Sequence, residues 1–368
     1  MAFVENIKNN TIKRFITCSV PSTVCNLKCS YCYIRQIKRN DMCTNRFVLP
    51  GLKLAELLTP QRLGGICYFN LCADGETLLH PDVIDLIDGL TIQGHYVDII
   101  TNGTISKKFD ELIKRLNDTQ QKHMFVKFSF HYLELLRTDL MNEFINNVNK
   151  IKNSLISYTI EITPHDELIK YIDEIKTISL SKFGALPHIT VARDENTKNI
   201  ELLTNFQREK YAQIWGQFDS KLFDFKLRIF NEKRKEFCYA GDWSLKLDLE
   251  TGKYRQCYRG CELGNICDEG AIHFKAIGCC PLPHCFNGHA FLALGNIPGL
   301  QVPTYSDERN RIMKDGDNWL KQDCAKFFST KLYESNEQYS SIKKGYYIIS
   351  SIYSRIINKL KLIIKNEK

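Results

Sequence analysis

Short apolar runs alternate with longer amphipathic segments along the first two hundred residues of the chain. The runs are rich in Val, Ile, Phe and Tyr, which favour β-strands. They predict six strands, at residues 15–20, 65–72, 96–100, 125–130, 158–162 and 188–192. Between them, apolar residues at helical spacing predict four helices, at residues 81–90, 107–117, 138–152 and 166–178. Strands and helices that alternate in this way imply right-handed βαβ units and a parallel sheet.

Six βα units predict an α/β fold, a partial (β/α)6 barrel of the TIM type that stays open on one side. In closed barrels of eight units the active groups lie on the loops that follow the strands. The residues with the most reactive side chains in this chain also fall at the predicted strand ends. We therefore expect the functional site at the carboxyl edge of the sheet.

Composition supports a globular protein of more than one part. The 368 residues are 43% hydrophobic and 25% charged, which is ordinary for a globular chain. This length allows a barrel and a smaller domain. The net charge of +8 is spread along the chain and indicates a solvated, lysine-rich surface rather than a specific anionic partner.

Fifteen cysteines are unusual for this length. Residues 1–14 are polar and mixed and do not form a signal peptide, and no apolar run reaches the roughly 18 residues of a membrane-spanning helix. Such a chain is predicted to be a reduced, cytoplasmic metal binder rather than a disulfide-stabilised protein. Cys18, Cys43 and Cys67 lie on or between predicted strands, and we expect all three to be packing residues.

Three cysteines, Cys25, Cys29 and Cys32, follow the first predicted strand on one short segment. Thiolates are soft ligands that favour iron–sulfur clusters, zinc or Cu(I). Because a cubane [4Fe–4S] cluster normally takes four cysteines, three leave one iron open to a ligand. The CxxxCxxC spacing, with Tyr31 before the last cysteine, resembles the signature of the radical S-adenosylmethionine (SAM) superfamily. A structural zinc knuckle and scattered buried thiols are the alternatives.

The resemblance implies a mechanism and two cofactors. In that superfamily the open iron chelates the amino and carboxylate groups of the methionine moiety of SAM. An electron from the [4Fe–4S] cluster then cleaves the sulfonium and yields a 5′-deoxyadenosyl radical. The resemblance thus implies that Cys25, Cys29 and Cys32 hold the catalytic cluster of an oxidoreductase or transferase, with an external electron donor such as flavodoxin or ferredoxin.

Asp74, Gly75 and Glu76 follow the second predicted strand. The segment resembles the Gly-Gly-Glu motif of the superfamily, which holds the SAM amino group, although Asp74 replaces the usual first glycine. Gly75 keeps a position at which backbone can approach a ligand closely. The resemblance makes Glu76 the partner of the SAM ammonium group, through a charge-assisted hydrogen bond.

Further candidates follow the later strands. By position, the resemblance assigns Asn102 and Ser129 to contacts with the ribose and the methionyl carboxylate, while a surface turn and a half-buried strand residue are the alternatives. His131 lies near the same rim and is a candidate for contact with SAM or substrate. Glu161 and Arg193 either line the site or form a structural ion pair.

Seven of the fifteen cysteines lie between residues 238 and 285. Cys238, a predicted hairpin with Gly252 in its turn, and Cys257 on the return strand resemble the opening of SPASM and twitch domains, which bind auxiliary [4Fe–4S] clusters. The chain lacks the longer cysteine series of a complete SPASM domain. The resemblance therefore implies one auxiliary cluster, with four ligands: Cys238, Cys257, Cys280 and Cys285.

Other ligand choices stay open in this region. Cys279 is an alternative to Cys280 as the third ligand. Cys261 and Cys267 are not needed for the cluster, and the role of Cys324 is undetermined. His284 and His289 are further candidate ligands. A zinc site is the alternative to the cluster, because thiolates readily close around zinc as a tetrahedron.

The domain prediction follows from this division. Residues 1–234 form the partial barrel, residues 235–305 the small cysteine-rich extension, and residues 306–368 a helical segment. Near the end of the chain, one helical face carries Ile349, Ile352, Tyr353, Ile356 and Leu360 among basic residues. Such a helix can lie on an anionic membrane surface, but the pattern favours a helix that covers the protein's own core.

The sequence therefore predicts a radical SAM enzyme that abstracts hydrogen from an unidentified substrate, either a peptide or protein side chain or a small metabolite. No winged-helix-like segment precedes Arg14, so recognition of a peptide leader would need a separate partner. A non-catalytic iron–sulfur protein for electron transfer or redox sensing is the alternative. A zinc-stabilised nucleic-acid binder is a third hypothesis, but no basic run with interleaved aromatic residues supports it.

Overall fold

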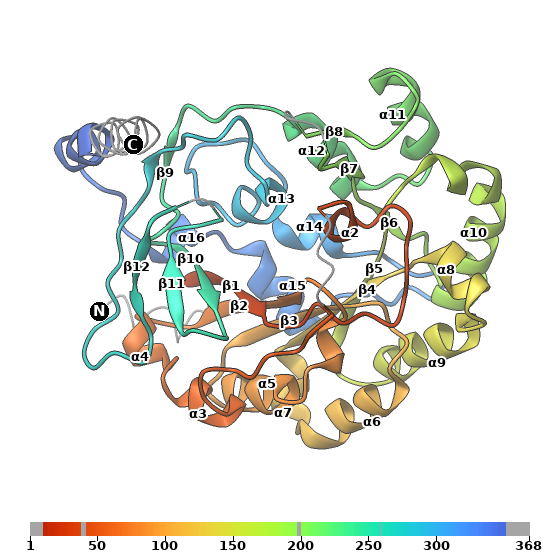
Figure 1. Cartoon of the computed structure of the whole chain (residues 1–368), viewed down its shortest axis with the longest axis horizontal. Helices are drawn as coiled ribbons and strands as arrows, with labels where there is room; N and C mark the ends of the chain where they lie inside the picture. Colours follow the sequence, from red (N-terminus) through yellow and green to blue (C-terminus); the bar gives the residue numbers. More distant parts are fainter. Residues whose placement is uncertain (1–9, 38–41, 197–199, 259, 351–368) are drawn as a thin grey trace, which may run out of the picture.

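The computed structural model describes residues 10–37, 42–196, 200–258 and 260–350. It has an α/β fold built on one nine-stranded, mostly parallel sheet with the strand order β12-β11-β10-β1-β2-β3-β4-β5-β6 (Figure 1). The strands are β1 (Arg14–Val20), β2 (Cys67–Ala73), β3 (Tyr96–Thr101), β4 (Met124–Ser129), β5 (Ser157–Ile162), β6 (His188–Ile189), β10 (Ser244–Asp248), β11 (Lys253–Arg255) and β12 (Glu262–Asn265).

All six predicted strands are present, and β1 to β6 pair in sequence order with parallel registers. Strand β6 is shorter than predicted and ends at Ile189. The predicted helices correspond to α5 (Val83–Ile92), α6 (Ser106–Arg115), α9 (Met141–Lys152) and α10 (Ile172–Ile178), the last preceded by the 3₁₀ helix η2 (Asp166–Tyr171). These helices form an arc along the outside of the sheet (Figure 1).

Shorter elements complete the first 234 residues. They include several helical turns that the apolar pattern did not predict. They are α2 (Tyr33–Gln36), α3 (Gly51–Glu56), α4 (Pro60–Leu63), η1 (Thr77–Leu79), α7 (Asp118–Lys122), α8 (Tyr132–Arg137), η3 (Ser179–Phe183), β7 (Arg193–Asp194), β8 (Glu201–Leu202), α11 (Arg208–Gly216) and α12 (Lys221–Ile229).

The two faces of the sheet bury different side chains, because successive residues of a strand point to opposite faces. The outer face carries aliphatic residues such as Ile16, Leu71 and Val97, which pack in one core with the surrounding helices. The inner face carries an aromatic layer, Phe15, Tyr68, Tyr96 and Phe125, which belongs to a second core. Farther along the same strands, the inner face becomes polar and leads to the carboxyl edge.

The C-terminal elements cover the aromatic layer. They are β9 (Phe237–Cys238), β13 (Gly278–Cys279), α13 (Gly288–Phe291), α14 (Tyr305–Arg309), α15 (Gln322–Ser329) and α16 (Leu332–Ser335). Phe327 of α15 stacks on Tyr96 with ring centroids 3.8 Å apart, and Phe328 packs edge-on against Tyr68 at 4.8 Å. The last part of the chain thus fills the inner side of the sheet.

The prediction of a continuously helical segment after residue 306 is wrong in part. Residues 310–321 are not helical; they carry a bridge between Ile312 and Asn318, and the Trp319 carbonyl accepts a hydrogen bond from the Tyr158 amide. Residues 341–350 are helical, and Ile349 is 70% exposed rather than covering a core. The other positions of the predicted amphipathic face lie outside the described residues.

The predicted hairpin is present and extends the main sheet. Strands β10 and β11 pair antiparallel, with Gly252 at a φ of 73° in the turn, and β10 pairs in parallel with β1. In this way the cysteine-rich region is hydrogen-bonded to the first strand of the sheet.

Two of the three cysteines predicted to pack in the core do so. Cys18 and Cys67 are buried, whereas Cys43 is exposed. The prediction for Cys43 is wrong because the segment around it pairs only through a single bridge, between Ser22 and Thr44, at the surface. Within the described ranges, we find no helix whose length and apolar character would let it cross a membrane.

Candidate functional site

The three cysteines of the CxxxCxxC segment lie on the loop between β1 and α2, at the carboxyl edge of the sheet. Cys29 is buried, and Cys25 and Cys32 are half-buried. Burial raises the pKa of Cys29 to about 12, and the charges of Cys32 and Cys25 act in the same direction. The thiols of Cys25 and Cys32 are thus close enough to Cys29 to oppose its ionisation, a cost that a bound cation would remove.

Gly75 brings the end of β2 against this loop. Its amide donates to the Ser22 carbonyl at 2.9 Å, and the Glu76 amide donates to the Val24 carbonyl at 2.8 Å. A Cβ atom on Gly75 would lie 2.1 Å from the Val24 carbonyl oxygen, so only glycine fits. The close approach therefore fixes the backbone immediately before Cys25.

Replacing Gly75 with alanine is expected to displace the cysteine loop, because backbone atoms of Val24 cannot move aside as a flexible side chain can. Iron content and SAM affinity should both fall, as measured by iron analysis and equilibrium dialysis. Gly216 at the end of α11 is the matched control, since a Cβ there meets nothing within 4 Å. Wild-type iron content and SAM affinity in Gly75→Ala would contradict this account.

The Glu76 carboxylate connects two strand ends. It is 2% exposed. One oxygen accepts hydrogen bonds from the Leu78 amide at 3.0 Å and the Thr101 hydroxyl at 2.6 Å, and the other accepts from the Asn102 amide at 2.7 Å. Burial raises the pKa of Glu76, while these three donors oppose the shift. Both carboxylate oxygens thus already accept hydrogen bonds from the protein. The contact of Glu76 with the SAM ammonium group stays a prediction.

Asn102 holds the cysteine loop from the end of β3. Its side-chain amide donates to Asn26 Oδ1 at 2.8 Å and lies 3.8 Å from Cys25 Sγ, and its Oδ1 accepts from the Thr104 hydroxyl at 2.7 Å. The side-chain amide of Asn26 in turn donates to the Thr104 hydroxyl at 2.8 Å. This network positions Cys25, and a direct contact of Asn102 with the ribose or carboxylate remains a prediction.

Tyr31 is held between two histidines beside the loop. Its hydroxyl lies 2.6 Å from His131 Nδ1, and its ring stacks on His165 with centroids 4.1 Å apart. Burial lowers the pKa of both His131 and His165 to about 4, so both imidazoles are neutral at neutral pH. Sequence reasoning identified Tyr31 and His131 but missed His165, which follows β5.

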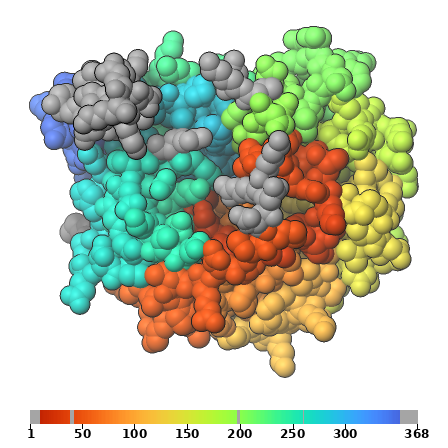
Figure 2. Space-filling view, in the orientation of Figure 1, coloured from red at the N-terminus to blue at the C-terminus, as the bar shows by residue number. Residues whose placement is uncertain are grey.

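A cavity of about 600 Å³ opens beside the loop. Its lining comes from α2, the carboxyl ends of β2 to β4, the segment after β6, helix α12, strand β10 and residues 284–290. In Figure 2 the segments coloured red, green and cyan, to which these elements belong, meet near the middle of the face shown. The first half of the chain and its cysteine-rich part therefore share one chamber.

Several predicted residues line this cavity or lie near it. Tyr31, Asp74, Arg193, His284 and His289 are in the lining. Ser129 ends β4 and is half-buried. Glu161 and Arg193 do not pair with each other: Arg309 binds Glu161 at 2.5 Å, and Arg193 binds Glu195 at 3.0 Å.

Among the lining residues that sequence reasoning missed, four carry a basic or phenolic side chain that can contact a ligand. They are Lys127 on β4, Lys226 on α12, Lys246 on β10 and Tyr258 after β11. For Lys127 a signal existed, since a lysine within an apolar strand must point either to solvent or to a buried partner. Its ammonium lies 2.5 Å from Asp98, and this ion pair is almost fully buried.

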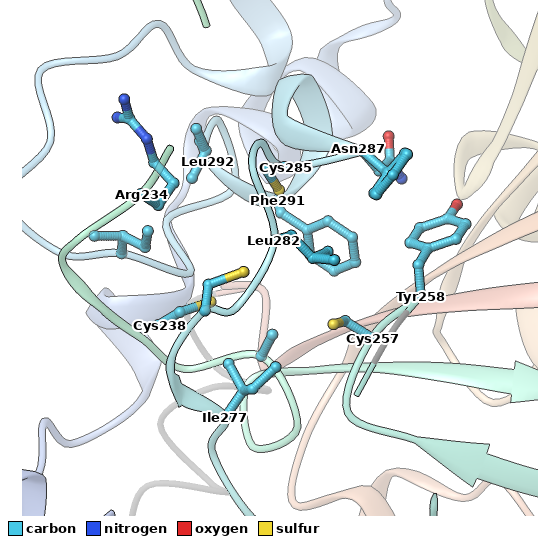
Figure 3. Close-up of a pocket in the computed structure, with 14 residues that line it drawn as sticks. Arg234, Cys238, Cys257, Tyr258, Ile277, Leu282, Cys285, Asn287, Phe291 and Leu292 are labelled. Atoms are coloured by element: carbon cyan, nitrogen blue, oxygen red, sulfur yellow. The ribbon is translucent and has the colours of Figure 1, made fainter. Parts of the chain in front are cut away.

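A second, apolar cavity of about 40 Å³ brings together the four cysteines of the predicted auxiliary site. Cys238, Cys257, Cys280 and Cys285 all line it. Figure 3 shows Cys238, Cys257 and Cys285 approaching it from different elements, with Tyr258 and Phe291 beside them. Burial raises the pKa of Cys285 to about 12, and Cys280 and Cys257 add to the shift. Tyr258 and Cys285 also line the larger cavity, so the two cavities are neighbours.

The remaining candidate ligands lie elsewhere. Cys279 belongs to β13 and is not among the described residues that line this cavity, whereas Cys280 is. Cys261 and Cys267 are exposed. The buried Cys324 donates to the Lys122 carbonyl, 3.3 Å away. The arrangement favours the set that contains Cys280.

In the described ranges, no three His, Cys, Asp or Glu side chains converge on the position of a single metal ion. A cubane cluster does not need such convergence, because each thiolate binds a different iron. Three thiols on the loop whose Tyr31 lines the larger cavity, and four thiols around the apolar cavity, provide the donor sets that two clusters would require. The residues present therefore fit both groups.

Comparison with protein families gives one match. Residues 19–177 match the model of the Radical SAM superfamily. This span contains the three loop cysteines, the Asp74–Glu76 segment, Asn102 and Ser129. The match supports a [4Fe–4S] cluster and SAM as cofactors of this region.

Three solved structures are among those to which the chain is similar. Streptococcus suis SuiB bound to S-adenosylmethionine is 14% identical, with a TM-score of 0.48 over 71% of this chain and 65% of that one. Native anSMEcpe with bound AdoMet is 15% identical, with a TM-score of 0.46 over 69% and 78%. The same protein with AdoMet and the Kp18Cys peptide is 13% identical, with a TM-score of 0.44 over 94% and 98%.

The chain thus spans 65% of the length of the SuiB structure. No curated protein matches the sequence. The functional proposal for this chain therefore rests on the family match and on the site itself.

Proposed function

We propose that this protein is a radical SAM enzyme with a partial (β/α)6 barrel and one auxiliary [4Fe–4S] cluster. The observation that carries the proposal is the loop of Cys25, Cys29 and Cys32, whose Tyr31 lines a cavity of about 600 Å³. It falls within the span that matches the Radical SAM superfamily. A protein that only transfers electrons or senses redox state needs no chamber of this size beside its cluster.

The chain's own residues would bind and orient the reactants. Cys25, Cys29 and Cys32 would hold the cluster, with Gly75 and Asn102 fixing their loop. When bound, the reduced cluster supplies the electron that cleaves the carbon–sulfur bond of SAM to methionine and a 5′-deoxyadenosyl radical. Tyr31, Asp74, Glu76 and Ser129 are the proposed SAM contacts. The walls of the cavity would exclude water and bring a substrate C–H bond within reach.

The test is SAM cleavage by anaerobically reconstituted protein after chemical reduction, with 5′-deoxyadenosine measured by chromatography. Formation of 5′-deoxyadenosine above that of protein without cluster supports the enzyme. If the reduced protein holds iron and sulfide but does not cleave SAM, the electron-transfer alternative replaces it. Zinc without iron in the purified protein would contradict both the radical SAM enzyme and the electron-transfer alternative.

We further propose that Cys238, Cys257, Cys280 and Cys285 bind the auxiliary cluster. Their support is the shared apolar cavity. Replacing Cys257 with alanine should remove about four iron atoms per chain, as iron analysis can measure, because one cubane is lost. SAM cleavage should persist, since the loop cysteines are intact.

Cys267→Ala is the matched control, because this exposed thiol lies outside the cavity lining. It should keep the wild-type iron content. Equal iron content in Cys257→Ala and wild type would remove the auxiliary cluster from the proposal.

The remaining features of the proposal concern organisation and partners. Residues 1–234, 235–305 and 306–368 form the barrel, the auxiliary domain and the C-terminal segment. Flavodoxin or ferredoxin would supply electrons, and the protein would act in the cytoplasm. The substrate is a peptide or protein side chain or a small metabolite.

A further inference from the structure

The large cavity has an excess of positive charge. Four basic side chains line it, those of Lys127, Arg193, Lys226 and Lys246, against two acidic ones, Asp74 and Glu195. Ion pairs within the protein already neutralise two of the four. Lys127 pairs with Asp98 at 2.5 Å, and Arg193 pairs with Glu195 at 3.0 Å.

Lys226 differs from these two residues. Its ammonium group donates to the Thr190 hydroxyl, and no described carboxylate oxygen lies within 4.0 Å of it. Glu161, the carboxylate with the largest electrostatic effect on it, is bound by Arg309. Glu161 and Glu308 act on the amine from a distance, but neither forms an ion pair with it. Burial of an amine without a paired opposite charge is unfavourable.

The surroundings of Lys226 favour an anion. Its hydrogen-bond partner Thr190 also lines the cavity and has a hydroxyl that can donate to a ligand. His289 lies nearby on α13, and burial holds its pKa well below its usual value, with Lys226 adding to the shift. The imidazole is therefore neutral and can donate one hydrogen bond without adding charge.

We propose that Lys226 and Thr190 form a subsite that binds a carboxylate group of the substrate. The inference rests on the proposed function, which makes this cavity the substrate chamber, and it narrows the substrate to a molecule with a free carboxylate. One unpaired ammonium matches a monoanion in charge. A phosphate dianion is typically held by a guanidinium fork or by several donors.

The carboxylate of SAM is the other source of the same chemistry. Under the proposed function it is held at the cysteine loop, which follows β1. Lys226 belongs to α12, which packs against α13 in a later part of the chain. We therefore assign the subsite to the substrate, and the experiment separates the two sources.

The experiment uses the reactivity of the amine itself. Burial lowers the pKa of Lys226 to about 7, so at neutral pH it should react with an N-hydroxysuccinimide acetate faster than ordinary lysines. Acetylation of the reconstituted protein is followed residue by residue by peptide mass spectrometry. Lys221 on the same helix, 68% exposed at its side chain, is the internal control.

Propionate and propionamide are the matched probes, equal in shape and different in charge, at constant ionic strength. Propionate should slow acetylation of Lys226 but not of Lys221, because a bound anion raises the pKa of the amine. At pH 7 the first unit of that rise lowers the reactive fraction about fivefold, and each further unit lowers it about tenfold. Propionamide should have no such effect.

The rate of acetylation as a function of pH gives the pKa of Lys226 directly. Several groups face this amine and set its value. They are Glu161 on β5, Glu308 and Arg309 on α14, and Arg193 on β7. Lys127 on β4 and His289 on α13 line the same cavity. The inflection should lie near pH 7 and move upward with propionate.

Equal protection by both probes, or protection by neither, would overturn the proposal. Protection by SAM that leaves no further effect for propionate would assign the subsite to the cofactor and also overturn it. Acetylation needs no turnover, so the two proposals can fail separately. If the protein does not cleave SAM but shows propionate-specific protection, the proposed function is wrong and the anion subsite stands.

Discussion

Cys29→Ala is expected to abolish 5′-deoxyadenosine formation in the reduced, reconstituted protein. Cys29 is the most buried of the three loop cysteines, and both other thiols act electrostatically on it. Two thiolates would leave the loop unable to hold a cubane with one open iron. We expect activity at the level of protein without cluster, together with loss of the iron attributed to this loop.

Cys43→Ala is the control for this prediction. Cys43 is exposed and lies near the same loop, with its carbonyl accepting from the Thr23 amide at 2.9 Å. The variant should cleave SAM at the wild-type rate. Undiminished 5′-deoxyadenosine in Cys29→Ala would defeat the proposed mechanism.

Phe328→Ala should give the largest loss of stability. The ring is fully buried and packs within 5.5 Å of Tyr68, Phe125 and Tyr305, measured between ring centroids. Removing a buried phenylalanine ring costs about 3–5 kcal/mol in the free energy of unfolding, since the cavity that remains cannot close. In a chain of this size, the apparent Tm should fall by roughly 5 °C or more, as circular dichroism under anaerobic conditions can measure.

Phe206→Ala is the matched control, because this phenylalanine is 40% exposed. It should change the free energy of unfolding by about 0.5 kcal/mol or less. A similar Tm for the two variants would mean that the C-terminal helices do not stabilise the sheet through their aromatic contacts.

The parallel part of the fold could be predicted because its signals are local. Each of the strands β1 to β5 contains apolar residues that are buried on both faces, and such a stretch stands out from its neighbours. The position of α15 could not be predicted, because Phe327 and Phe328 pack against Tyr68, Tyr96 and Phe125, which lie more than two hundred residues earlier in the chain. Nothing in the local pattern distinguishes them from a helix that packs on its own neighbours.

The residues of the candidate site likewise divide into those that short sequence motifs predict and those that only the fold reveals. The cysteines, Gly75 and Asn102 belong to short motifs that place them together at the strand ends. Lys226 lies in a helix that the apolar pattern did not single out, and its importance comes from what surrounds it. Tyr258 follows a candidate ligand directly, yet only the folded chain shows that it borders both cavities.

The parallel ladder between β1 and β10 has a consequence for electron transfer. The cysteine loop continues from β1, and the hairpin that leads to Cys257 continues from β10, with Phe15 to Ser19 in register with Ser244 to Asp248. Both clusters of the proposed enzyme would therefore be bound by segments that extend from two strands hydrogen-bonded to each other. The distance between the two clusters, over which an electron must tunnel, would then stay constant while substrates enter and leave.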